Sequence, residues 1–171
     1  MDVKASPDTA VTRVLVVADW AVDPHGVIAA CRRRAARGQT AFALVVPAWL
    51  HGLDWVGDPY ASRPCAARQV EALKRLATAA RLDVDLAEVG DPDPTSAIED
   101  ARGAYATTEI LVCARPRRLD HPFSLVRRTR RATGVTVREV AIRARPGERE
   151  RRGWTVLRDG GHCASDAPQA A

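Results

Sequence analysis

Apolar runs of strand length alternate along most of the chain with amphipathic stretches. A continuous apolar run predicts a strand that is covered on both faces. The predicted buried strands are Arg13–Ala18, Thr40–Val46 and Glu109–Ala114. The run Val84–Val89 alternates apolar and polar residues and predicts a more exposed edge strand. A last strand is expected over Val135–Ile142.

Between these runs, apolar residues recur at helical spacing. The predicted helices are Pro24–Arg37, Cys65–Leu82, Pro94 to about Tyr105, and a short helix over about Phe123–Ala132. Asp23 and Asp93 are good N-caps, because each precedes a proline that suits the first helical position. Gly38 is expected to cap the first helix at its carboxyl end. Strands and helices therefore alternate, which predicts an α/β fold with one doubly wound parallel sheet and helices on both faces.

The two ends of the chain fall outside this alternation. Residues 1–11 are polar and predict a flexible N-terminus. Residues 144–171 mix charge, Gly, Pro and Ala without periodicity, which predicts a basic, disordered tail. The folded domain is therefore expected over residues 12–143.

One long connection inside this domain carries much of the aromatic content, including Trp49, Trp55 and Tyr60. A loop of this length usually folds over a pocket or a partner. Its aromatic side chains either anchor the loop to the sheet edge or offer a surface, Trp49–Tyr60, to a protein partner.

Composition narrows the class of protein. The chain has 171 residues, of which 46% are hydrophobic and 27% charged, a balance typical of one folded domain. No apolar run reaches the roughly 18 residues of a membrane span, and the first ten residues lack a signal-peptide core, so we expect a cytoplasmic protein without membrane contact. Four isolated cysteines and four scattered histidines predict buried free thiols and no metal site.

The net charge of +5 is unevenly distributed. Residues 115–152 hold thirteen arginines and four carboxylates, a net charge of +9, so the rest of the chain carries −4. Such a region could bind nucleic acid, but no aromatic residues interleave with its arginines and no recognition helix is evident. Nucleic-acid binding is therefore the least favoured of the functions considered.

Three segments together resemble the universal stress protein family. They are RVLVVAD at the first strand, the turn Gly90-Asp91-Pro92 that opens a helix, and EILVCA as a late strand; TGVTVREVAI is similar to the closing strand of the family. The resemblance covers about residues 12–143. It implies a five-stranded parallel sheet of order 3-2-1-4-5, frequent homodimers through the last strand, and in one subgroup ATP binding where the first and fourth strands diverge.

The glycines that bind ATP in that subgroup are missing here. ATP-binding members carry Gly-x2-Gly-x9-Gly-Ser/Thr after the fourth strand, so that the backbone can close around phosphate. The matching positions are Ala114, Arg117, Arg127 and Arg128, and Pro116 removes an amide donor. The resemblance therefore implies impaired or absent ATP binding.

The candidate ligand-binding residues are Asp19, Arg115, Arg117 and Arg118. Asp19 matches an acidic residue of the family and either meets a ribose or adenine edge or caps the turn after the strand. The arginines either approach phosphate or another anion through their side chains or form a solvated basic loop. In a third arrangement, an arginine fills the phosphate position and pairs with Asp19.

The sequence favours a small regulatory or interaction domain of universal-stress type that is not an enzyme and needs no cofactor. It has no Gly-x-Ser-x-Gly elbow, and no cysteine has an evident His–carboxylate partner. The alternative is a protein that binds ATP, AMP or another anion at the switch point of the sheet. Arg138 and Glu139 in the last strand weigh against a homodimer there, since charges protect a strand edge from pairing.

Overall fold

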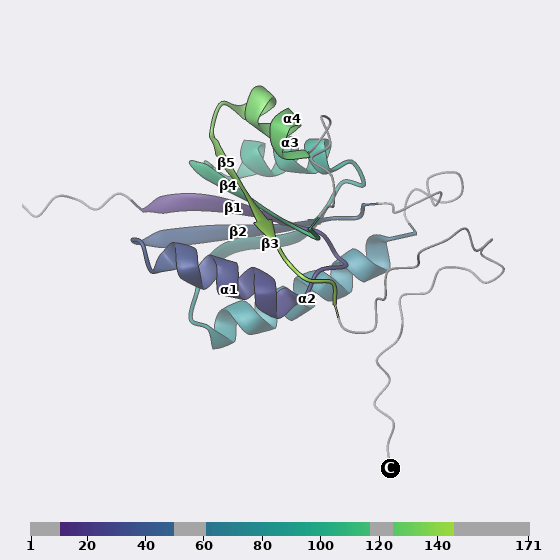
Figure 1. Ribbon diagram of the computed structural model, residues 1–171, viewed down its shortest axis with the longest axis horizontal. Coiled ribbons are helices and arrows are strands. Elements are labelled where there is room, and N and C mark those ends of the chain that lie inside the picture. Colours follow the sequence, from purple (N-terminus) through teal and green to yellow (C-terminus); the bar gives the residue numbers. More distant parts are fainter. Residues whose placement is uncertain (1–10, 50–60, 117–124, 146–171) are drawn as a thin grey trace, which may run out of the picture.

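Five parallel strands form one sheet in the order β3-β2-β1-β4-β5 (Figure 1). The computed structural model describes residues 11–49, 61–116 and 125–145. The strands are β1 Thr12–Ala18, β2 Thr40–Pro47, β3 Asp83–Gly90, β4 Glu109–Ala114 and β5 Thr136–Ala141. The helices are α1 Pro24–Ala35, α2 Arg63–Ala79, α3 Pro94–Ala104 and α4 Leu125–Thr133. The predicted doubly wound α/β fold and its strand order are confirmed.

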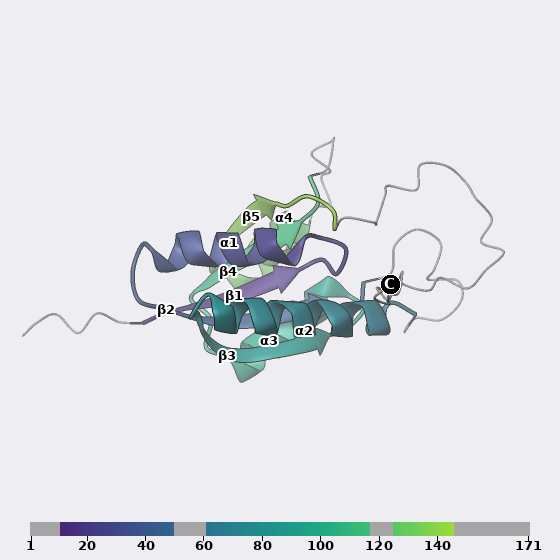
Figure 2. The same cartoon turned by 90° about the horizontal axis from the view of Figure 1, so that it is seen from below.

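The helices form a layer on each face of the sheet. Helices α1 and α2 cover one face, and α3 and α4 cover the other (Figure 1, Figure 2). Phe42 and Leu44 pack with the first pair of helices, whereas Leu15 and Ile110 pack with the second. Within the described ranges, no helix is both long enough and apolar enough to cross a membrane.

All five strands lie within one residue of their predicted bounds, but two helices end earlier than predicted. Helix α1 ends at Ala35, because the amides of Arg37 and Gly38 bond to carbonyls three residues back. Helix α2 ends at Ala79, before Arg81 with its φ of 53°. The amides after it close a Schellman motif, which normally has glycine at that position.

Edge strand β3 contains a bulge that the sequence pattern did not predict. Val84 pairs with Phe42 and Leu86 pairs with Ala43, so Asp85 is an extra residue in the ladder. Val84 therefore packs on the α1 and α2 face and Leu86 on the opposite face. The predicted alternation is broken at Asp85, and an exposed charge on a bulge protects the sheet edge.

Candidate functional site

The carboxyl ends of β1 and β4 define the switch point of the sheet. The two strands pair in parallel, with Ala18 beside Cys113. Strand β2 flanks β1 on one side and β5 flanks β4 on the other, so the strand order reverses between them. Open α/β sheets bind their ligands in the crevice at this point. Asp19 follows β1 and Arg115 follows β4, so the fold brings these two predicted site residues together.

The carboxylate of Asp19 is engaged through both of its oxygens. Oδ1 accepts a hydrogen bond of 2.9 Å from the backbone amide of Ala21. Oδ2 lies 3.6 Å from Nε of Arg115 in an ion pair whose side chains are 6% and 35% exposed, respectively. This is the arrangement in which an arginine pairs with Asp19. Arg115 thus places its positive charge beside Asp19 at the switch point.

In the described part of the structure, no other predicted arginine is seen to contact the Asp19–Arg115 pair. Arg117 and Arg118 lie outside the described residues. Arg127 and Arg128, which match the last glycine and the following Ser/Thr of the ATP-binding pattern, are exposed on α4. Ala114, which matches the first, is the last residue of β4.

Residues Ile142–Arg145 cross the switch point; we call this segment the C-terminal strap. The Ile142 amide donates to the carbonyl of Ala114, at the end of β4, over 2.9 Å. The Asp23 amide, just before α1, donates to the Arg143 carbonyl, also over 2.9 Å. The strap therefore joins the end of β4 to the start of α1. The sequence had assigned its last two residues to the tail.

Gln69 of α2 holds the far end of the strap. The amide of Arg145 donates to the carbonyl of Ala21 over 2.9 Å, and its guanidinium bonds to Oε1 of Gln69. Nε2 of this fully buried glutamine donates to the Val22 carbonyl over 2.9 Å. Sequence reasoning missed Gln69, although a polar residue four positions before Leu73, on the apolar stripe of a predicted helix, was a visible signal.

The first residue of the aromatic loop lies against the β1–α1 turn. Nε1 of Trp20 donates to the Trp49 carbonyl over 2.8 Å. The remainder of the proposed Trp49–Tyr60 surface lies outside the described residues.

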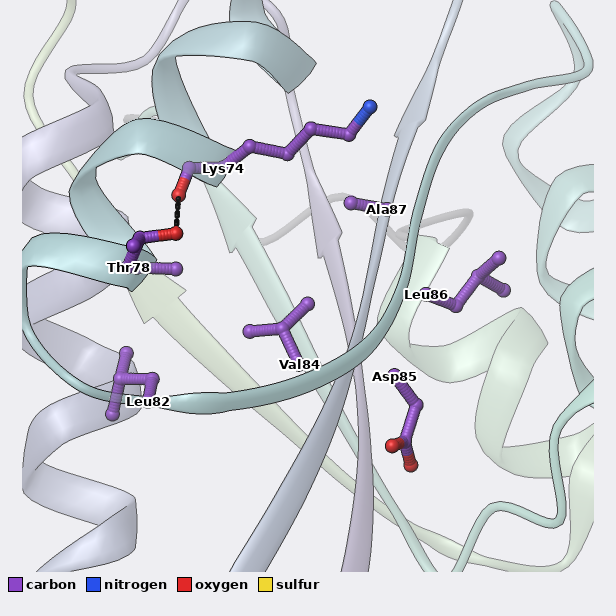
Figure 3. Close-up of a pocket in the computed structure, with 8 residues that line it drawn as sticks. Lys74, Thr78, Leu82, Val84, Asp85, Leu86 and Ala87 are labelled. Atoms are coloured by element: carbon purple, nitrogen blue, oxygen red, sulfur yellow. Dashed lines mark hydrogen bonds between the residues drawn. The ribbon is translucent and has the colours of Figure 1, made fainter.

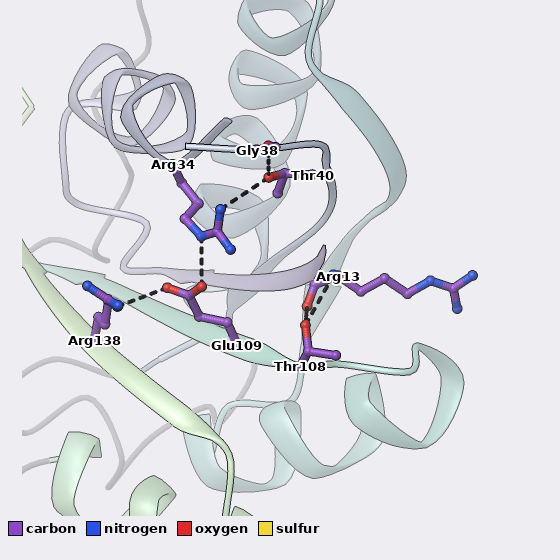
Figure 4. A network of polar contacts seen from close by, with 7 residues as sticks. All are labelled: Arg13, Arg34, Gly38, Thr40, Thr108, Glu109 and Arg138. Carbon is purple, nitrogen blue, oxygen red and sulfur yellow. Dashed lines mark hydrogen bonds and ion pairs between the residues drawn. The ribbon is translucent and has the colours of Figure 1, made fainter. Parts of the chain in front are cut away.

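A polar network occupies the opposite, amino-terminal edge of the sheet (Figure 4). Glu109, which opens β4, lies 2.7 Å from Nε of Arg34 and 3.0 Å from Nε of Arg138. The Arg34 guanidinium also donates to Thr40 Oγ1 over 3.3 Å. Arg138, interpreted from the sequence as a charge that protects the last strand from pairing, thus has a partner inside its own domain. The network joins α1, β2, β4 and β5 and is structural.

A groove of about 310 Å³ lies between α2 and edge strand β3 (Figure 3). Its lining is mixed, with Leu82 and Val84 among the apolar side chains and Lys74 and Asp85 among the polar ones. The Thr78 hydroxyl on this lining is bonded to the Lys74 carbonyl at 3.0 Å. Among the described residues no group of His, Cys, Asp or Glu could hold a metal ion.

The cysteines that the structure describes differ in state. Cys31 and Cys113 are free and fully buried, as predicted. Burial raises the pKa of the Cys31 thiol to about 12 and also raises the pKa of Cys113. Both thiols are therefore protonated and poor nucleophiles at neutral pH. Cys65 is in a disulfide, so the prediction of a free thiol is wrong for this residue.

Comparison with protein-family models and with curated proteins finds no match to this chain. The fold and the site together define a doubly wound α/β domain whose switch point holds an internal ion pair, with a strap of its own chain bonded to the end of β4 and to the β1–α1 turn. The likeness to universal stress proteins stays a prediction from the sequence.

Proposed function

We propose that this chain is a non-catalytic regulatory or interaction domain of universal-stress type that does not bind ATP at its switch point. The observation that supports the proposal most directly is the Asp19–Arg115 ion pair. Asp19 already accepts a hydrogen bond from the amide of Ala21 and pairs with Arg115, so a ribose hydroxyl would have to compete with these contacts for the carboxylate. The loss of the phosphate-binding glycines points the same way.

The charges of the site also oppose a nucleotide. A nucleotide that recruited Arg115 to its phosphates would take this guanidinium away from the Asp19 carboxylate, which is 6% exposed, and bring negative charge next to it. A buried carboxylate without a counter-charge is strongly destabilising. Binding therefore has to overcome both the lost ion pair and the new repulsion.

Titration calorimetry of the whole chain with Mg-ATP, ADP and AMP tests the proposal at low and at physiological salt. We expect no saturable heat, because binding would have to break the Asp19–Arg115 pair and the phosphate-binding glycines are missing. Saturable binding at one site per chain would contradict the proposal. If that binding were then lost in both Arg115→Ala and Arg117→Ala, the alternative of an anion site built from Asp19 and the arginines Arg115, Arg117 and Arg118 would replace it.

The binding partners that we propose for such a domain come from the sequence alone. The candidates are a protein that contacts the Trp49–Tyr60 loop and a second copy of the chain. A cytoplasmic location belongs to the same proposal, although disulfides such as that of Cys65 are more usual in oxidising compartments.

A second candidate function, polyanion binding, is favoured by one observation on α4. Arg127, Arg128 and Arg131 are all exposed, and this helix contains no acidic residue. Arginines that meet phosphates give an affinity that falls steeply with salt. If the candidate is right, Arg128→Glu/Arg131→Glu should weaken duplex DNA binding at least about tenfold and reduce the salt slope by about two.

The matched control for this experiment is Arg32→Glu/Arg33→Glu, which reverses two exposed arginines on α1. Fluorescence anisotropy of a labelled duplex, measured at several salt concentrations, gives both quantities. Equal losses in the two variants would mean that net charge alone governs binding, and this would dismiss a specific surface on α4.

A further inference from the structure

The C-terminal strap contacts the end of β4 and the turn between β1 and α1, which the pairing of the five strands does not join. Strand β5 ends at Ala141, and the chain then turns across the ends of β4 and β1 toward α1 and α2 (Figure 1). Ala144 forms an isolated antiparallel bridge with Val22, in a molecule whose sheet is otherwise parallel. The Val22–Ala144 bridge therefore lies outside the ladders of the five-stranded sheet.

The strap fits closely against α1. A Cβ atom added to Gly26 would lie 2.6 Å from Cγ2 of Ile142, closer than non-bonded carbon atoms come. Ile142 is buried here and belongs to the same apolar cluster as Cys113 and Cys31. The glycine in the first turn of α1 thus allows the strap to reach the core.

Within the described part of the chain, a small set of interactions holds the strap in this position. The three amides of Ile142, Asp23 and Arg145 take part, together with the Ile142 side chain and the Arg145–Gln69 contact. The side chain of Arg143, between them, is exposed. Central strand β1, by comparison, is paired along both of its edges. A segment with few contacts opens at a lower free energy than the core that it covers.

We propose that the strap is a latch: it opens as a unit while the sheet stays folded, and its opening uncovers the carboxyl end of β4 at the switch point. The Arg145–Gln69 contact, which we call the catch, is the side-chain interaction that holds the strap closed. Opening would free the Ala21 carbonyl and the Asp23 amide, an acceptor and a donor that the strap now occupies. The inference rests on the proposed function insofar as it takes the closed switch point as the resting state.

Amide hydrogen exchange of the whole chain, followed by NMR, tests the latch. In the wild-type chain we expect the amides of Asp23 and Arg145 to exchange at matching opening free energies and faster than those of Leu15 and Val112 in the central strands. Arg145→Ala should accelerate exchange at Asp23 about 10- to 100-fold, because Gln69 loses a charge-assisted bond. The amides of Leu15 and Val112 should change much less.

Arg143→Ala is the matched control. It removes the same type of side chain two residues away, but it keeps the backbone carbonyl that bonds to Asp23. We expect its effect on Asp23 exchange to stay within about twofold, since the exposed side chain makes no described contact with the site. Equal acceleration by both variants would overturn the role of the Arg145–Gln69 catch.

Alkylation of Cys113, followed by peptide mass spectrometry, is the second readout. The thiol is buried beneath the region that the strap crosses, so Arg145→Ala should raise its labelling rate in parallel with Asp23 exchange. Faster amide exchange without faster labelling would overturn the claim that the latch covers the end of β4. Strap amides as slow as those of Leu15 would overturn the latch altogether.

Mg-ATP titration of the same variants separates this inference from the proposed function. Nucleotide binding by the wild-type chain would contradict the proposed function, whereas the latch would still be judged by exchange and labelling. Binding that appeared only in Arg145→Ala would support the latch, because it would show that the strap blocks entry.

Discussion

Glu109→Gln is expected to lower the free energy of unfolding by about 3 kcal/mol. The Glu109 side chain is 9% exposed and stands between Arg34 and Arg138. The glutamine keeps the shape of the side chain but removes its charge, so Arg34, which is 15% exposed, would lie nearly buried beside a neutral amide. Breaking a buried ion pair on one side is costly because the remaining charge has lost both water and its partner.

Urea unfolding of the whole chain, with the slope of the transition compared between variants, measures this loss. The matched control is Glu71→Gln, which breaks the exposed pair of Glu71 with Lys74 on α2. Exposed pairs contribute little, so the control should change stability by less than about 0.5 kcal/mol. A loss below about 1 kcal/mol for Glu109→Gln would contradict the assignment of this network as a structural tie.

The two arginines of this network should differ in their contributions. Arg138 is 55% exposed, so water already screens its interaction with Glu109, whereas Arg34 is largely enclosed. Arg34→Ala is therefore expected to cost more stability than Arg138→Ala, and the order of the two values checks the burial argument.

Gly90→Ala is expected to destabilise the domain by about 2 kcal/mol, through crowding alone. Gly90 ends β3 and is the glycine of the Gly-Asp-Pro turn that resembles the universal stress family. An added Cβ would lie 2.7 Å from Cβ of Ala97 and 2.9 Å from Cγ1 of Val45. Neither neighbour is the end of a flexible chain, so α3 or β2 has to move. The glycine therefore serves close packing of a strand against a helix.

Gly103→Ala provides a control of opposite sign. Gly103 lies in α3, and an added Cβ there would meet no atom within 4 Å. Alanine favours the helix more than glycine does, so this variant should gain roughly 0.5–1 kcal/mol. Both values come from the same urea experiment. A neutral or stabilising Gly90→Ala would show that the packing around Gly90 relaxes freely, and would contradict the prediction.

Much of the scaffold could be predicted because its signals are local. Continuous apolar runs located β1, β2 and β4, and an alternating run located β3. Asp23 and Asp93 cap α1 and α3, as predicted. The same kind of reasoning was wrong about α2 at its carboxyl end. Arg81 adopts a conformation that favours glycine, and no local residue preference indicates an arginine there.

The candidate site was only partly predictable. The sequence predicted Asp19 and Arg115 as site residues and gave their pairing as one of several arrangements. The two residues are 96 positions apart in the chain, and the sequence does not show how far apart their side chains lie in space. The parallel pairing of β1 with β4 brings them together. Gln69 could be recognised in the sequence as a polar residue on an apolar stripe. Its bonds to Val22 and Arg145 could not, because they depend on where α2 lies over the sheet.

The sequence by itself determined the alternation of strands and helices, the capped helix starts and the absence of the phosphate-binding glycines, since each depends on neighbouring residues alone. Tertiary structure decided what the polar side chains do. It placed Glu109 between two arginines, set the bulge at Asp85 and drew the strap across the switch point. The physical reason is that an ion pair or a backbone bridge between distant segments is fixed by packing geometry, which the order of residues does not contain.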